Sequence, residues 1–136
     1  MNNILIADDD KEDCFLIKKA VEKVRITTHV DFVKNGEEVI TYLAQQHHRD
    51  QRPKLILLDL NMPRMDGREV LSIIKKDHQL KEIPVVILTT SQTEEDLHAA
   101  YYLGANSFIT KPILFKELVK VIESLIFYWF HTVKLP

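Results

Sequence analysis

Aspartates follow two apolar runs of this chain. The run ILIA is followed at once by Asp8, Asp9 and Asp10, and the run LILL is followed by Asp59. Carboxylates that lie close together repel one another when ionised, and a hard divalent cation relieves that repulsion. Mg²⁺ binds one or two carboxylates and keeps several waters. The pattern therefore predicts a Mg²⁺ site formed by Asp9 and Asp59 with a backbone carbonyl from the turn that follows.

A hydroxyl and an ammonium follow two further apolar runs. The segment ILTTS ends its run at Thr89, and the segment ITKP ends its run at Lys111. Phosphoryl transfer to a carboxylate needs an acceptor oxygen, a cation that neutralises charge, and donors for the phosphoryl oxygens. Taken singly, the acidic triplet is an ordinary solvated helix cap, and the threonine and lysine are ordinary strand-end residues. Their convergence favours a phosphoacceptor site that contains Asp59, Thr89 and Lys111.

Five short segments have the composition of buried strands. Three are apolar at every position, which is typical of parallel strands covered by helices on both faces, and two are weaker candidates. The expected strands are residues 4–7, 29–33, 55–58, 85–88 and 107–110.

Segments of helical periodicity separate these strands, and most of them begin with a capping residue. The expected N-caps are Asp10 or a neighbour, Asn35, Asp66 and Thr93. Gly104 is expected to end the fourth helix, and a fifth helix is expected from about Leu114 onward.

The strands and helices alternate with short connections. Right-handed crossovers then give an α/β fold, an open parallel sheet with helices on both faces. In such sheets the site lies beyond the carboxyl ends of the strands, near the point where the strand order reverses. The aspartates after the first and third strands are therefore expected at one rim, together with Thr89 and Lys111.

Length and charge restrict the class of protein. A chain of 136 residues with 46% hydrophobic residues suits one globular domain, expected to span residues 1–136. The formal net charge of −2 offers no basic field to nucleic acid, so nonspecific DNA binding is not expected. The N-terminus resembles neither a signal peptide nor a membrane span, which indicates a cytoplasmic protein. Cys14 is the only cysteine, which excludes an intrachain disulfide, and it is expected to be a small core residue.

Four segments resemble the CheY-like receiver domain of two-component response regulators. They are ILIADDD, LILLDLNMPRMDG, IPVVILTTS and GANSFITKPI, and they occur in the family's order and spacing over residues 3 to about 125. The resemblance implies the flavodoxin-like fold, with five parallel strands in the order 2-1-3-4-5 and five helices on both faces.

The resemblance also implies roles for the strand-end residues. Asp59 would accept a phosphoryl group from a histidine kinase, while Asp8 and Asp9 hold Mg²⁺ together with Asp59 and the backbone carbonyl of Asn61. The protein would thus be a phosphoacceptor signalling protein and not an enzyme, apart from self-catalysed phosphotransfer and dephosphorylation.

A switch between two states is implied at the other strand ends. Thr89 would turn toward the phosphate, Lys111 would pair with it, and Phe108 would change rotamer together with Thr89. The Lys111–Pro112 peptide bond is expected to be cis. Two positions depart from the family's common pattern: Thr90 is larger than the small residue often found there, and Phe108 replaces a frequent tyrosine.

The C-terminal segment FYWFHTVKLP carries a second, narrower resemblance. It is similar to the tail of the small response regulators that partner phytochrome-type histidine kinases, and LTTS points the same way.

The same segment extends beyond the helix that should cover the sheet. A helix that begins near Leu114 needs about 12 to 13 residues to cross the sheet, so it has done so by Ile126. The residues then left with little core of their own are Phe127, Tyr128, Trp129, Phe130 and Val133. Such a cluster favours a homodimer through the last helix and the extension at about 127–136. The alternative is that the tail folds back over the domain.

A metal-dependent phosphohydrolase with an aspartyl nucleophile is the alternative function. Haloacid-dehalogenase phosphatases carry a second aspartate two residues after the nucleophile, whereas Asn61 stands there in this chain. No cap insertion interrupts the sequence either. A receiver that acts only as a scaffold is also conceivable, but every phosphorylation residue is present, so the phosphoacceptor interpretation is favoured.

Overall fold

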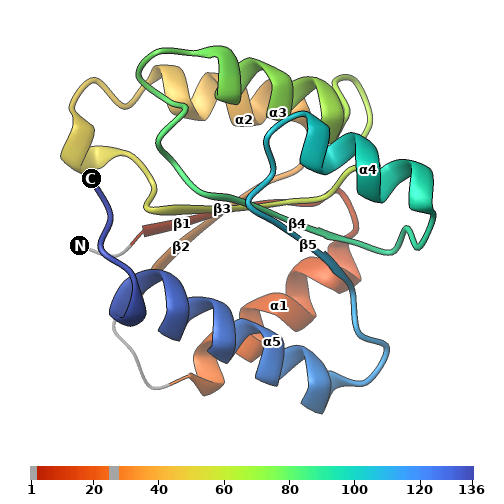
Figure 1. Cartoon of the computed structure of the whole chain (residues 1–136). Coiled ribbons are helices and arrows are strands. Elements are labelled where there is room, and N and C mark those ends of the chain that lie inside the picture. The colour runs from red at the N-terminus through yellow and green to blue at the C-terminus, as the bar shows by residue number, and fades with distance from the viewer. Residues whose placement is uncertain (1–2, 25–27) are drawn as a thin grey trace.

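A sheet of five parallel strands forms the centre of the computed structural model, which describes residues 3–24 and 28–136 (Figure 1). The strands are β1 (Asn3–Ala7), β2 (His29–Val33), β3 (Leu55–Leu58), β4 (Val85–Thr89) and β5 (Ser107–Thr110). They lie in the order β2-β1-β3-β4-β5, and each neighbouring pair is parallel. The predicted flavodoxin-like α/β fold is confirmed, and the five expected strands differ from the observed ones by at most one residue at an end.

The described residues form five α-helices, which cover the two faces of this sheet. They are α1 (Lys11–Lys23), α2 (Gly36–Ala44), α3 (Gly67–Lys76), α4 (Glu94–Tyr102) and α5 (Phe115–Phe127). Figure 1 shows α2, α3 and α4 on one face and α1 with α5 on the other. A short 3₁₀ turn (Arg49–Gln51) lies between α2 and β3, and a π-helical turn (Tyr128–Thr132) follows α5.

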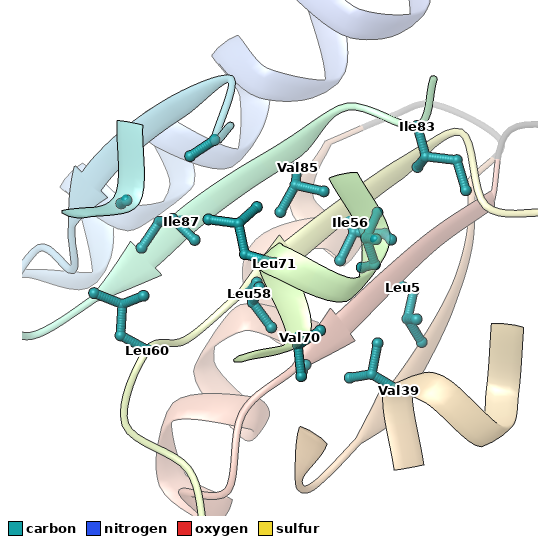
Figure 2. Close-up of a cluster of buried hydrophobic side chains, with 14 of the residues drawn as sticks. Leu5, Val39, Ile56, Leu58, Leu60, Val70, Leu71, Ile83, Val85 and Ile87 are labelled. Atoms are coloured by element: carbon teal, nitrogen blue, oxygen red, sulfur yellow. The ribbon is translucent and has the colours of Figure 1, made fainter. Parts of the chain in front are cut away.

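The alternation of side chains along each strand divides the core into two layers. Leu5 and Ala7 of β1 belong to the cluster under α2, α3 and α4, part of which Figure 2 shows, whereas Ile4 and Ile6 belong to the cluster under α1 and α5. Successive strand residues point to opposite faces, so a strand covered on both faces must be apolar at every position. This requirement explains the uninterrupted apolar runs of β1, β3 and β4.

The predicted helix caps hold the first turns of four helices. Side-chain oxygens of Asp10, Asn35, Asp66 and Thr93 each accept a hydrogen bond from a backbone N–H in the first turn. Each bond satisfies a donor that the helix leaves free. Gly104 ends α4 with φ of 106°, a conformation that glycine adopts without steric cost. All of these predicted caps are confirmed.

Gly67 lets α3 begin directly beside the end of β3. Its N–H donates to the carbonyl of Leu60 at 2.9 Å, and a Cβ added at position 67 would lie 2.2 Å from the carbonyl oxygen of Asp59. The backbone there has no room for a side chain. The chain thus turns back after Asp59 and packs the start of α3 against it.

The C-terminal extension lies partly on the domain's own core. Trp129 and Phe130 pack against the cluster under α1 and α5, whereas Phe127 and Tyr128 remain 61% and 49% exposed. The expectation that all of these aromatic residues lack core of their own is therefore wrong for Trp129 and Phe130. Further along the extension, Leu135 lines a pocket that Lys54 also lines. Among the residues that the structure describes, no helix is long and apolar enough to cross a bilayer.

We expect Gly67→Ala to destabilise the fold, because the new Cβ must displace the backbone of Asp59 and Leu60. The free energy of unfolding in urea should fall by at least about 2 kcal/mol, the scale of an overpacked core. Glu69→Ala, an exposed change in the same helical turn, is the matched control and should cost only a few tenths of a kcal/mol. Equal stability of the two variants would show that the contact at position 67 is not tight.

Candidate functional site

Three carboxylates meet at the carboxyl end of the sheet. Asp8 and Asp9 follow β1, Asp59 follows β3, and one oxygen of each lies within 4.8 Å of the others. Asp8 and Asp59 are 2% and 7% exposed, while Asp9 is exposed. The sheet fixes the backbone of Asp59, because its N–H donates to the carbonyl of Ala7 at 3.0 Å. The predicted convergence of the strand-end aspartates is thus seen in the structure.

The ammonium of Lys111 lies among the carboxylates. Its Nζ is 2.6 Å from Asp8 Oδ2, 2.7 Å from Asp13 Oδ2 and 3.1 Å from Asp59 Oδ2. The ammonium thus lies within ion-pair distance of three carboxylates at once. The Lys111 side chain is only 9% exposed, and its backbone N–H donates to the carbonyl of Thr89 at 2.7 Å. Through its Nζ atom, the lysine that follows β5 therefore contacts the residues after β1 and β3 and the first turn of α1.

Burial and pairing shift the protonation of this group. Burial raises the pKa of Asp8, and it outweighs the opposing hydrogen bonds from Lys111 and from the N–H of Asp10. Burial also favours the neutral form of Lys111, but hydrogen bonds to Asp13 and Asp8 and the charge of Asp59 prevail and raise the pKa of Lys111 above its ordinary value. The lysine thus stays charged near neutral pH. One ammonium among several carboxylates leaves the site with excess negative charge, which suits a divalent cation.

Asn61 and Thr89 lie beside the acidic group. The N–H of Asn61 donates to Asp59 Oδ1 at 3.3 Å, which orients the carboxylate from the turn after β3. Thr89 is fully buried at the end of β4, and its hydroxyl accepts a hydrogen bond from the N–H of Ser91 at 3.4 Å. The backbone N–H of Lys111 donates to the carbonyl of Thr89 and not to the Thr89 hydroxyl. Phe108 lies on β5, partly buried against the cluster under α4.

The Lys111–Pro112 peptide bond is trans, so the expected cis bond is wrong. Trans is the favoured form of X–Pro bonds in the absence of a constraint that selects cis. With this trans bond the Lys111 side chain already reaches all three carboxylates.

Asp13 is a site residue that the sequence interpretation missed. It lies in the first turn of α1, and Asp10 caps this turn by accepting the N–H of Asp13 at 3.0 Å. Side chains of an α-helix tilt toward its N-terminus, so the Asp13 carboxylate points back toward the end of β1. No local pattern signals this role, because the partner of Asp13 is Lys111, 98 positions further along the chain.

Cys14 follows Asp13 and is half-buried beside the site, so the predicted core position is only partly reached. Its Sγ donates to the carbonyl of Asp8 at 3.4 Å. Burial and the charge of Asp8 raise the pKa of this thiol to about 11. The residue is therefore a neutral thiol near pH 7 and does not act as a nucleophile there.

A second polar cluster, also missed, ties α4 to α3 next to the site. Asp96 of α4 forms an ion pair with Arg68 of α3, and the Ser91 hydroxyl donates to Asp96 Oδ2 at 2.5 Å. Hydrogen bonds from Ser91 and Arg68 lower the pKa of Asp96. The cluster restrains the loop that follows Thr89.

Known proteins are similar to this chain in sequence. The model of the response regulator receiver domain family matches residues 4–123. The chain is similar to response regulator Rcp1 of Synechocystis sp., with 41% identity over 98% of this chain and 92% of that protein. It is also similar to the probable methanogenesis regulatory protein FilR2 of Methanothrix harundinacea, with 38% identity over 93% of this chain and 82% of that protein.

Solved structures agree with these sequence matches. The Mn²⁺-bound form of Rcp1 superimposes with a TM-score of 0.88 at 40% identity, over 100% of this chain and 99% of that one. The phosphorylated cyanobacterial phytochrome response regulator RcpA superimposes with a TM-score of 0.90 at 40% identity, over 99% and 98% of the two chains. These matches give no support to the phosphohydrolase alternative. The strand order, the acidic group with its lysine and the match over residues 4–123 agree, and the chain belongs to the response regulator receiver domain family.

Proposed function

We propose that this protein receives a phosphoryl group on Asp59 from the phosphohistidine of a histidine kinase, in a reaction that requires Mg²⁺. The observation that carries the proposal is the position of Asp59, whose carboxylate lies both in the acidic group and 3.1 Å from the Lys111 ammonium. An acceptor oxygen next to a cation site and a fixed ammonium is the arrangement that phosphoryl transfer needs.

Asp59 would act as the nucleophile. Its carboxylate is held by the N–H of Asn61 and by Lys111, so an oxygen is already oriented before a donor arrives. An Asp59 oxygen forms a bond to phosphorus while the phosphorus–nitrogen bond to the histidine ring breaks, and the ring nitrogen keeps the electron pair. Lys111 then lies beside the new phosphoryl oxygens and can pair with one of them.

The acidic group fits a hard divalent cation. Asp8, Asp9 and Asp59, with the backbone carbonyl of Asn61, would hold Mg²⁺, since these are the oxygen ligands that Mg²⁺ prefers. When bound, the ion neutralises charge on the phosphoryl oxygens. The related protein Rcp1 has been crystallised in a Mn²⁺-bound form, which supports a cation at this edge.

Thr89 and Phe108 would carry the signal away from the site. Thr89 is buried at the end of β4, and a turn of its hydroxyl toward the phosphoryl group would break its bond with Ser91. The space it vacates would then be open to Phe108, which lies on β5 opposite Ile87 and thus diagonally from Thr89.

The kinase partner is proposed to be of the phytochrome type. Two observations support this proposal: the 40% identity to RcpA, which is described as a phytochrome response regulator, and the FYWFHTVKLP tail. We also propose that the protein is cytoplasmic.

The protein is further proposed to form a homodimer through α5 and its extension. Phe127 and Tyr128 remain exposed there although Trp129 and Phe130 are packed inward. Exposed aromatic residues of this kind are common anchors of interfaces.

Asp59→Asn should abolish phosphorylation, because it replaces the carboxylate that we propose as the acceptor with an amide. Incubation with acetyl phosphate and Mg²⁺, followed by intact-mass measurement, should add one phosphoryl group to the wild type and none to the variant. A mass increase in Asp59→Asn equal to that of the wild type would refute the assignment.

Asp9→Asn should stabilise the metal-free protein and remove its stabilisation by Mg²⁺. Asp9 is exposed at the acidic group, so its charge mainly repels its neighbours; two unit charges about 4 Å apart interact by about 1 kcal/mol in water. We therefore expect about 1 kcal/mol more stability in urea with EDTA, and no further gain when Mg²⁺ replaces EDTA. The control is Asp50→Asn, an exposed aspartate in the 3₁₀ turn, which should respond to Mg²⁺ as the wild type does. An undiminished Mg²⁺ effect in Asp9→Asn would contradict its role as a ligand.

Phe127→Glu should convert the dimer into a monomer, because it places like charges across a two-fold interface. This substitution leaves Trp129 and Phe130 in their packed positions, which a truncation at Ile126 would not. Light scattering is the measurement, and Tyr102→Glu on α4, at a side chain that is 90% exposed, is the control. A monomeric wild type, or a variant that stays dimeric, would rule out the proposed interface.

A further inference from the structure

Lys111 shares two of its three carboxylate partners with the proposed cation. Asp8 and Asp59 each form an ion pair with the ammonium, and the same two residues belong to the group that would bind Mg²⁺. The two positive charges repel each other when both are close to the same carboxylates. A bound cation therefore weakens the hold of Asp8 and Asp59 on the lysine.

Asp13 is the one ammonium partner that lies outside the acidic group. Its Oδ2 is 2.7 Å from Lys111 Nζ, whereas the residues that could jointly hold a cation, among those that the structure describes, are Asp8, Asp9 and Asp59. The Asp13 side chain is 30% exposed and lies on α1, so it borders the site from the side of the helix. It can keep its contact with the lysine while a cation occupies the shared carboxylates.

We propose that Asp13 is a positioning residue that retains the Lys111 ammonium at the site when Mg²⁺ binds. This inference rests on the proposed function, since it presupposes that Mg²⁺ binds at Asp8, Asp9 and Asp59. Asp13 thereby lowers the cost of cation binding and keeps the lysine ready for the phosphoryl group.

A purely electrostatic role for Asp13 makes a different prediction. A carboxylate that only adds negative charge strengthens Mg²⁺ binding whether or not Lys111 is present. A carboxylate that holds Lys111 strengthens Mg²⁺ binding mainly when the lysine is there to be held. The coupling between the two side chains in a double-mutant cycle separates these roles.

The test is calorimetric titration of Mg²⁺ into the full chain. With Lys111 present, Asp13→Asn should raise the Mg²⁺ dissociation constant about tenfold, and in a Lys111→Met background by only about twofold to threefold. Glu12→Gln is the matched control, because it removes one charge from the adjacent, exposed position of the same turn, and it should change the constant by less than about twofold.

A second readout follows the lysine itself. The ¹⁵Nζ resonance of Lys111 should persist in the wild type when Mg²⁺ is added, because Asp13 protects the ammonium from exchange with water. In Asp13→Asn the same addition should broaden it beyond detection. Equal effects of Asp13→Asn in the two backgrounds, or a Lys111 resonance that persists in the variant, would overturn the inference and leave the proposed function intact. A wild type that does not bind Mg²⁺ would overturn both.

Discussion

The ammonium of Lys111 is the interaction on which the site depends. It is buried and contacts carboxylates that follow β1 and β3 and one that lies on α1. Loss of one partner of a buried ion pair typically costs about 3 to 5 kcal/mol, whereas an exposed pair contributes about 0 to 1 kcal/mol. The surface pairs of this chain, such as Arg64 with Glu37, therefore matter far less than this one. Without the lysine, the aspartates at the rim would repel one another, and the N–H groups of Asp10 and Asn61 would offset this repulsion only in part.

The fold brings these charges together through its strand ends and helix starts. Parallel strands end at one rim, and short turns then lead into helices whose first turns are capped by Asp10 and Asp66. Gly67 allows α3 to begin against the backbone of Asp59, and the Arg68–Asp96 ion pair holds α4 beside it. The acidic group thus stands on a rigid frame, and the hydrogen bond from Ser91 to Asp96 ties the loop after Thr89 to the same frame.

Local patterns, combined with the rule that parallel strands end at one rim, predicted the strands, the helix starts and the meeting of the strand-end aspartates, but they missed side-chain contacts that helices make with distant residues. Apolar runs and caps indicated the strands and helix starts because burial and capping act within a few residues. The contact between Asp13 and Lys111 joins residues 98 positions apart, and no periodicity reports such a pair. The same holds for Arg68 with Asp96, and for Trp129, whose place on the core depends on how the chain turns after α5. The roles of Asp59, Thr89, Lys111 and Asn61 in phosphorylation and Mg²⁺ binding stay predictions.

Stability and the proposed function depend on the same group of charges, since the carboxylates that destabilise the metal-free site are those that would bind the cation. A crystal structure of the full chain with Mn²⁺ and beryllofluoride, a mimic of the phosphoryl group, tests this most directly. We expect one anomalous peak at Asp8, Asp9 and Asp59, beryllofluoride on Asp59, and Lys111 Nζ in contact with both a fluoride and Asp13. Beryllofluoride on another carboxylate, or Mn²⁺ bound away from these three aspartates, would contradict the account.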